Sequence, residues 1–257
     1  MLRAADPPAS RLSGSAAPDK AVAMDDQSIT GRAYQTLRAQ IIGCFLKPGS
    51  RLNISSLQSS LSLSQAAVRE ALSRLTAEGL VEIERHRGFR VAPVSASGFR
   101  ELTEACITIE MPLIRSAVAN GDLEWERQLI AAYHRAAQTL QQVVAGQEGV
   151  EAYSTERQNF YEVLLSPCEN KWLLWSWRLL YAQNMRYRHM YLSLARLELE
   201  QLPRHEEIVQ AVLKRDIDKV EKMAVANYEQ VMDAIEQAMA DDAEAQAQGR
   251  PKRRKAA

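Results

Sequence analysis

The chain has 257 residues, of which 46% are hydrophobic and 25% charged, the balance of an ordinary soluble protein of one or two domains. No apolar run approaches the ~18 residues that a membrane span requires, and the first 27 residues carry charges where a signal peptide would be apolar. The three cysteines are odd in number and share no CxxC spacing. This excludes a disulfide framework and a cysteine zinc site, and it favours a reducing, cytoplasmic location.

The formal net charge of zero conceals a division along the chain. Residues 28–95 hold nine Lys or Arg and four Asp or Glu, a net charge of +5, whereas residues 96–241 hold 15 against 22, a net charge of −7. This partition predicts two modules, the first of which faces a polyanion. A solvated basic face without a partner would give the same partition, so charge alone leaves both interpretations open.

The two ends of the chain are predicted to be disordered tails. Residues 1–27 are rich in Ala, Pro and Ser and cannot bury enough apolar surface to offset their ordering entropy. Residues 242–257 end in the basic run RPKRRK, which could add non-specific affinity for phosphates or be a solvated tail.

The first folded stretch, residues 28–95, has the pattern of a winged helix-turn-helix. Apolar residues predict helices over 33–45, 54–61 and 65–78, with Ser64 as the N-cap of the third helix. Alternating apolar and charged residues then predict a hairpin, with strands at 81–85 and 89–94 around Gly88. A small α+β module with a structural hairpin is the alternative, but it does not explain why basic residues gather at the hairpin tip.

From Ser97 onward the sequence shows no strand signal. Helices are expected at about 97–119, 124–145, 150–166, 170–193, 198–214 and 216–240. Six helices form a bundle over residues 96–241 that is large enough for a core and an internal pocket. The fold class expected is therefore mainly α, a winged helix-turn-helix followed by a helical bundle. The aromatic residues between Trp172 and Tyr191 are expected in the core or the helix interfaces of this bundle.

Residues 28–95 contain a series of short motifs: Tyr34-x-x-Leu37-Arg38-x-x-Ile41, Pro48-Gly49-x-x-Leu52, Ser64-x-x-x-Val68-Arg69-Glu70-Ala71-Leu72, Glu78-Gly79-Leu80-Val81 and Arg87-Gly88-Phe89-x-Val91. In their order and spacing these motifs resemble those of the GntR family of bacterial transcription regulators. A weaker match continues through the bundle and resembles the FCD type of effector domain. It comprises Ile109-Glu110, Ala117-x-Ala119, Asn159-Phe160-Tyr161, His205-x-x-Ile208-x-x-Ala211 and Arg215-Asp216. The resemblance spans about residues 28–240 and implies a ligand-responsive DNA-binding homodimer.

The predicted recognition helix begins at Ser64, and the first residues of such a helix reach base edges in the major groove. The candidate DNA contacts in this helix and its surroundings are Ser64, Gln65, Ala66, Arg69, Arg38 and Arg74, and those in the wing are Arg87 and Gly88. A salt bridge to Glu78 or near Glu70 is the alternative for Arg69. The family commonly has Arg where Gln65 stands and in some members Arg where Ser55 stands, so its usual operator is not expected here.

The resemblance also implies an effector site, but with altered residues. Many relatives bind a divalent metal ion through an Asp, a His four residues later, and one His in each of two later helices. The matching positions here are Arg157, Tyr161, His205 and Asn227, of which only His205 keeps a metal-ligand type. We therefore expect no metal and no other cofactor, and direct binding of an organic anion, with Arg186 as a weaker additional contact. The alternative is that Arg157 faces solvent or pairs with an acid near Glu156.

The sequence thus predicts a cytoplasmic regulator, associated with the nucleoid when bound to DNA, that binds double-stranded operator DNA and a small organic acid. Two alternatives stay open. One is an all-helical enzyme that uses His205 and Glu206 as an acid–base pair beside an appended winged helix, although no catalytic motif accompanies that pair. The other is a winged helix that contacts proteins rather than DNA.

Overall fold

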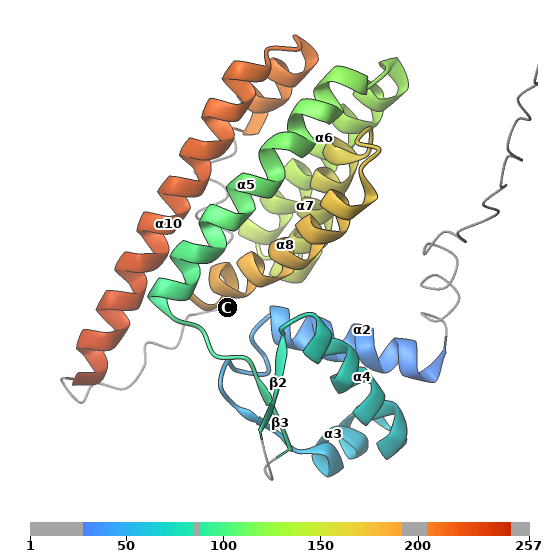
Figure 1. Ribbon diagram of the computed structural model, residues 1–257, viewed down its shortest axis with the longest axis vertical. Coiled ribbons are helices and arrows are strands. Elements are labelled where there is room, and N and C mark those ends of the chain that lie inside the picture. The colour runs from blue at the N-terminus through green and yellow to red at the C-terminus, as the bar shows by residue number, and fades with distance from the viewer. Residues whose placement is uncertain (1–27, 85–87, 192–204, 248–257) are drawn as a thin grey trace, which may run out of the picture.

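The structure, a computed structural model, describes residues 28–84, 88–191 and 205–247. It contains a small N-terminal domain with three helices and a sheet, and a larger domain of long helices (Figure 1). This confirms the fold class predicted from the sequence.

The N-terminal domain consists of α2 (Ile29–Ile42), β1 (Arg51–Leu52), α3 (Ile54–Leu61), α4 (Gln65–Ala77), β2 (Val81–Glu84) and β3 (Gly88–Val91). The strands form an antiparallel sheet in the order β1-β3-β2. Strand β1 was not expected, because two residues are too short to show the alternation by which a strand is recognised. Strand β3 is shorter than predicted and begins one residue earlier, whereas residues 85–87 at the tip of the hairpin lie outside the described residues.

Polar caps and an apolar core explain why these segments fold. The side chains of Ser28, Asn53 and Ser64 accept hydrogen bonds from backbone N–H groups at the starts of α2, α3 and α4, so the N-cap predicted for Ser64 is confirmed. Helix α2 begins four residues earlier than expected, at the first position after its cap. The core of this domain joins the three helices to the sheet and includes Leu37, Ile41, Val68, Leu72, Leu75, Leu80 and Val91.

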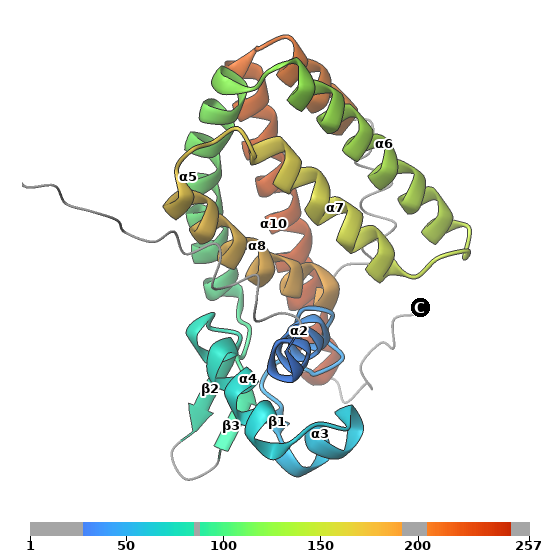
Figure 2. The same ribbon diagram turned by 90° about the vertical axis from the view of Figure 1, so that its right-hand side faces the viewer.

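The second domain contains α5 (Ala96–Asn120), α6 (Leu123–Val144), α7 (Val150–Leu165), α8 (Lys171–Tyr191), a helix over residues 205–213, and α10 (Ile217–Ala247). Part of the helix expected at 198–214 lies outside the described residues. Helices α5 and α10 run side by side, and α6 and α7 form a second pair (Figures 1 and 2). Among the described helices none combines the length and apolarity needed to cross a membrane.

Helix α10 runs beyond its predicted end. The expected tail began at residue 242, but α10 continues to Ala247 because Ala, Glu and Gln are strong helix formers. The other residues expected to be disordered, 1–27 and 248–257, lie outside the described residues.

The expectation that the aromatic residues of α8 are buried holds for only part of the helix. Trp177 and Tyr187 are buried, but Trp172 is 79% exposed and Trp175 is 55% exposed. These two tryptophans lie in the first turns of α8, where Leu173 and Leu174 instead pack against the core, and the two rings contact each other edge to face.

Candidate DNA-binding surface and ligand cavity

The start of α4 presents an exposed polar face. Gln65, Ala66 and Arg69 are exposed, whereas Val68 and Leu72 on the opposite face are buried in the core. Ser64 is also exposed, but its hydroxyl caps the helix by accepting a hydrogen bond from Ala67 N at 3.1 Å. The arrangement leaves Gln65 and Arg69, one helical turn apart, as the long side chains that can reach a base edge.

Arg69 makes no ion pair or hydrogen bond with the described residues. The salt bridge to Glu78 considered from the sequence does not form, because the Glu78 carboxylate accepts hydrogen bonds from Tyr34 Oη and from Arg38 Nε, the latter at 3.0 Å. Arg69 is therefore available for DNA.

Arg38 and Arg74, two further candidates for DNA contact, belong to an internal cluster. Arg38 pairs with Glu78, and the Arg74 guanidinium lies 4.1 Å from the centre of the Tyr34 ring. Burial, and then the hydrogen bond to Glu78, raise the pKa of Tyr34 to about 12. The cluster holds α2 against the end of α4. Arg38 and Arg74 thus have partners within the domain, and their contact with DNA stays a prediction.

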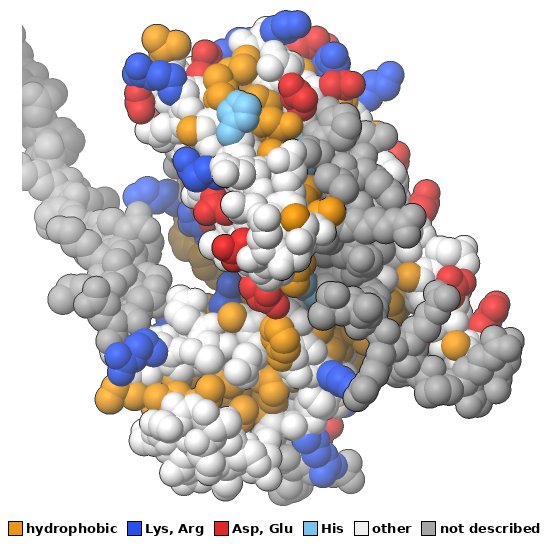
Figure 3. Space-filling model, turned by 180° about the vertical axis from the view of Figure 1, so that it is seen from behind, with side chains coloured by type: hydrophobic (Ala, Val, Ile, Leu, Met, Phe, Trp, Pro, Cys, Tyr) orange, Lys and Arg blue, Asp and Glu red, His pale blue; other side chains and the backbone are white. Residues whose placement is uncertain are grey.

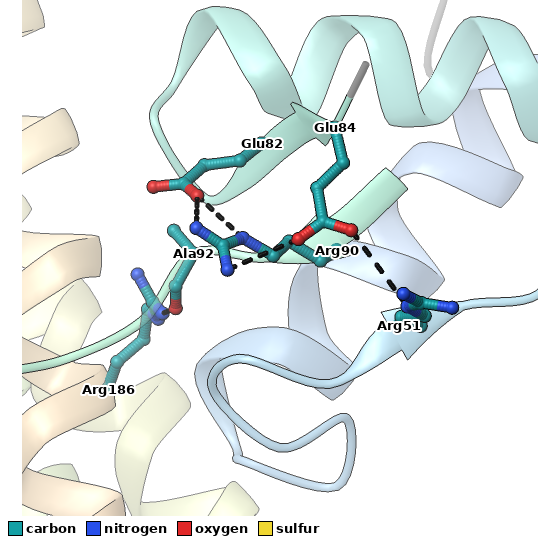
Figure 4. Close-up of polar contacts among 6 residues, drawn as sticks. All are labelled: Arg51, Glu82, Glu84, Arg90, Ala92 and Arg186. Atoms are coloured by element: carbon teal, nitrogen blue, oxygen red, sulfur yellow. Dashed lines mark hydrogen bonds and ion pairs between the residues drawn. The ribbon is translucent and has the colours of Figure 1, made fainter. Parts of the chain in front are cut away.

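The sheet beneath the wing is nearly neutral. Arg90 Nη2 lies 2.6 Å from Glu82 Oε2 and its Nη1 lies 3.3 Å from Glu84 Oε1, while Arg51 lies 3.9 Å from Glu84 (Figure 4). Gly88 has φ +85°, a backbone conformation that favours glycine, as expected for a tight turn. Arg87 lies outside the described residues.

Helix α3, the other helix of the helix-turn-helix, has a neutral outer face. Its sequence contains no charged residue, and its exposed side chains are Ser55, Ser56, Gln58, Ser59 and Ser60. The lowest part of Figure 3 shows this area as a white surface with Lys and Arg side chains only toward its edges. Contacts with DNA at this face would be neutral hydrogen bonds rather than ion pairs.

Two small adjoining cavities lie inside the helical domain. The first is lined by residues of α5, α7, α10 and the helix over 205–213, including Glu110, Asn227 and Tyr228. The second is lined by residues of α6 and α7, including Arg157, and by His205. Phe160, Tyr161 and His205 line both cavities and so form the boundary between them. The free space is about 20 Å³ in the first and 10 Å³ in the second, room for about one water molecule each.

Four of the five residues predicted to bind an effector line these cavities: Arg157, Tyr161, His205 and Asn227. Arg157 is only 5% exposed, so the alternative that it faces solvent is wrong. Its Nη1 donates to Tyr181 Oη at 2.9 Å and contacts Met185 Sδ at 3.4 Å, and its guanidinium lies 4.9 Å from the Tyr161 ring centre.

Glu110 is a cavity residue that the prediction of the effector site missed. It is buried, and its Oε2 accepts hydrogen bonds from Trp177 Nε1 at 2.9 Å and from Tyr228 Oη at 2.7 Å. Burial raises the pKa of Glu110, although both hydrogen bonds and the nearby Arg157 oppose that shift. The sequence contained a signal, since an acid at a position that the helical period places in the core needs partners.

Arg186, the weaker candidate, is not a cavity residue. It lies on the side of α8 that contacts the N-terminal domain, where its Nη2 donates to Ala92 O at 2.5 Å (Figure 4). Its Nη1 donates to Gln183 Oε1 at 2.6 Å, and Gln183 Nε2 donates in turn to Glu78 O at 2.9 Å. Arg186 is 1% exposed, and burial lowers its pKa. It joins the two domains.

The family assignment follows from both domains. Residues 29–91 match the family described as "Bacterial regulatory proteins, gntR family", and residues 101–230 match the FCD domain. The chain belongs to the GntR family and carries an FCD domain. It is a DNA-binding transcription regulator, as the motifs predicted, and not an enzyme. His205 is buried and the adjacent Glu206 is exposed, so the two side chains lie in different surroundings.

Similar proteins cover both domains of this GntR regulator. BphR of Paraburkholderia xenovorans (strain LB400), an uncharacterized HTH-type transcriptional regulator, is 31% identical over 82% of this chain and 86% of its own length. The HTH-type transcriptional repressor GlaR of Escherichia coli (strain K12) is 29% identical over 80% of this chain and 96% of GlaR. The structure of E. coli McbR/YncC superposes with a TM-score of 0.69 at 20% identity, covering 82% of this chain and 98% of McbR, and shows the same fold.

Because Arg69 is exposed and makes no ion pair with the described residues, we predict that it binds DNA directly. We expect Arg69→Ala to weaken binding to an operator, selected from random duplexes, by about 1–3 kcal/mol, because a bidentate pair with guanine or a strong phosphate contact is lost. Fluorescence anisotropy with a labelled operator measures the change. Arg127→Ala, which removes an exposed arginine of α6, should leave affinity unchanged. No measurable loss in Arg69→Ala would remove this residue from the DNA interface.

The exposed Gln65 predicts a change of base preference relative to typical family members. Gln pairs bidentately with adenine and Arg with guanine. We expect Gln65→Arg to shift the base selected from random duplexes from adenine toward guanine, and to steepen the dependence of affinity on salt. An identical selected motif for the wild type and the variant would show that Gln65 does not contact a base.

Proposed function

We propose that the FCD domain of this regulator binds a small organic acid directly, without a metal ion, and that binding changes the affinity for operator DNA. The strongest support is that Arg157 is a buried cation at the edge of a cavity. Tyr161, Tyr181 and His205 lie near it and supply further polar groups. A guanidinium binds a carboxylate through two parallel hydrogen bonds, and it does so most strongly away from water.

The cavity residues do not suit the divalent ion that many relatives bind. A guanidinium at position 157 repels a cation where those relatives place a carboxylate. Tyr161 and Asn227 replace two histidines, which leaves His205 as the one remaining member of the set. Across the described residues no group of three or more His, Cys, Asp or Glu side chains is placed to hold a metal. The donor set fits an anion better than a cation.

Helix α8 offers a route from the cavity to the DNA-binding domain. Tyr181 and Met185 on one side of the helix contact Arg157, and Gln183 and Arg186 on another side contact the N-terminal domain. A carboxylate that draws the Arg157 guanidinium away from Tyr181 would change the packing of α8. The contact of α8 with Glu78, at the end of the recognition helix, would change with it.

The regulator would act as a homodimer in the cytoplasm, where the DNA is. Two recognition helices related by a two-fold axis match two half-sites about one helical turn apart. Because GlaR is named a repressor, we propose that this regulator represses its target and that the acid releases it.

Direct acid binding predicts a specific loss in one variant. Calorimetry with small carboxylic acids should detect binding to the wild type, and Arg157→Ala should weaken it by at least about tenfold, because a charge-assisted pair worth about 1.5–3 kcal/mol is lost. Arg135→Ala, which removes an arginine paired with Glu156 on the surface, is the matched control. Metal analysis of protein purified without chelator should find no stoichiometric metal. Stoichiometric zinc, nickel or manganese that is lost in His205→Ala would contradict the metal-free site.

If the acid acts through α8, a variant can keep acid binding and lose the effect of the acid on operator affinity. We expect Gln183→Ala to bind the acid as the wild type does, while the effect of the acid on operator affinity, about 5–150-fold for typical allosteric coupling, shrinks severalfold. Titration of a labelled operator with and without the acid measures the coupling. Arg178→Ala, an exposed residue of α8 that pairs with Glu162, should respond as the wild type does. An unchanged response in Gln183→Ala would exclude this route.

A further inference from the structure

A histidine near the end of α8 bridges this helix to α7. His189 is partly buried, and its Nδ1 donates a hydrogen bond to Met185 O at 2.8 Å, since a carbonyl oxygen only accepts. Its Nε2 lies 3.1 Å from the Oγ of Ser154 on α7. The bridge is next to two contacts that the proposed function uses, because the side chain of Met185 contacts Arg157, and Arg186 bonds to the N-terminal domain.

The partners of His189 suit the ring with or without a second proton. In the neutral ring Nε2 is an acceptor, and the Ser154 hydroxyl donates to it. Once Nε2 is protonated it donates to Ser154 Oγ, and the hydroxyl proton turns to Val150 O, which lies 3.0 Å away. Both states of the ring keep their hydrogen bonds, so His189 can gain a proton without leaving a donor or acceptor unpaired.

The surroundings of the ring favour its neutral form. Burial is the largest effect, and it lowers the pKa of His189 below its usual value of 6.5 despite the hydrogen bond to Met185. Among charged groups, Glu151 of α7 attracts a proton to the ring, whereas Arg157 of α7 and Arg188 of α8 repel it. The ring is therefore neutral above about pH 6.5, and at lower pH a positive charge appears near two arginines.

We propose that His189 and Ser154 form a pH-sensitive contact between α7 and α8, and that protonation of His189 weakens binding to the operator. A further positive charge near Arg157 and Arg188 pushes α7 and α8 apart, close to the point where α8 contacts the N-terminal domain. The switch depends on the proposed function, in which α8 connects the domains, but its signal is a proton rather than an organic acid. Because the operator-binding state holds fewer protons, affinity is full above about pH 6.5 and falls as the pH decreases below it.

Operator affinity measured against pH tests the switch. The parent protein is the full chain with His86→Gln, since protonation of a histidine in the wing would by itself strengthen binding to DNA. Fluorescence anisotropy with an operator selected from random duplexes, at constant ionic strength, covers the range from about pH 5 to pH 8. We expect affinity to fall by at least about threefold as the pH decreases, since each unit by which the pKa of His189 differs between free and bound protein is worth tenfold.

Three variants of this parent separate His189 from other groups. His189→Gln keeps an amide for Ser154 but takes up no proton, so it should lose the decrease in affinity. Ser154→Ala removes the acceptor of the protonated ring, so the decrease should move to lower pH. His134→Gln makes the same change at an exposed position of α6 and should respond as the parent does.

NMR signals of the histidine rings report the protonation of His189 directly, with its signal assigned by its absence in His189→Gln. An equal pH dependence in the parent and in His189→Gln would overturn the switch, and so would a pH response that persists unchanged in Gln183→Ala. Acid binding and its effect at pH 7.5, where His189 is neutral, test the proposed function separately. An intact acid response without a response to pH would overturn the switch and leave the proposed function standing.

Discussion

Helix α8 has to pack against both domains at once, and this constraint links the ligand cavity to the DNA-binding domain. With 3.6 residues per turn, Trp177, Tyr181 and Met185 project to one side, toward Glu110 and Arg157. Arg186 projects to another side and is buried against the N-terminal domain. A buried guanidinium is costly unless its donors are bonded, so the contact with Ala92 O fixes how α8 sits against the sheet. Under the proposed function, a shift at one side of this helix changes the packing at the other.

Electrostatics divides the DNA-binding domain into two kinds of surface. Glutamates form salt bridges with Arg38 and Arg90 and, at a longer distance, with Arg51. The positive charge available to face DNA is therefore smaller than the net charge of residues 28–95. The neutral face of α3 and the start of α4 offer serine hydroxyls and the Gln65 amide instead. We therefore expect recognition at this surface to depend on hydrogen-bond geometry more than on the number of cations, with Gln65 and Arg69 as the main contacts.

Local patterns in the sequence predicted most of the fold. Helical periodicity located the long helices to within a few residues, and the Ser64 cap marked the start of α4. The sequence pattern misplaces the end of α10, because the charged and polar residues there resemble a tail although they are good helix formers. Strand β1 has no local signal, since it exists only by pairing with β3.

The ligand cavity was predicted in part. Family correspondence identified Arg157, Tyr161, His205 and Asn227, which three separate helical segments bring together. The correspondence did not reveal that Arg186 faces the N-terminal domain, because the place of a residue on a helix does not specify which element packs against it. Glu110 was missed for the same reason: only tertiary packing brings Trp177 and Tyr228 to its carboxylate.

Hydrogen–deuterium exchange of the full chain, with and without a bound acid, tests the coupling through α8 most directly. We expect the acid to change exchange in α7 and α8, and also at Glu78–Leu80 and Ala92–Ser95, where the N-terminal domain meets α8. Changes confined to α7, α10 and the helix over 205–213, with no effect on α8 or the N-terminal domain, would contradict it.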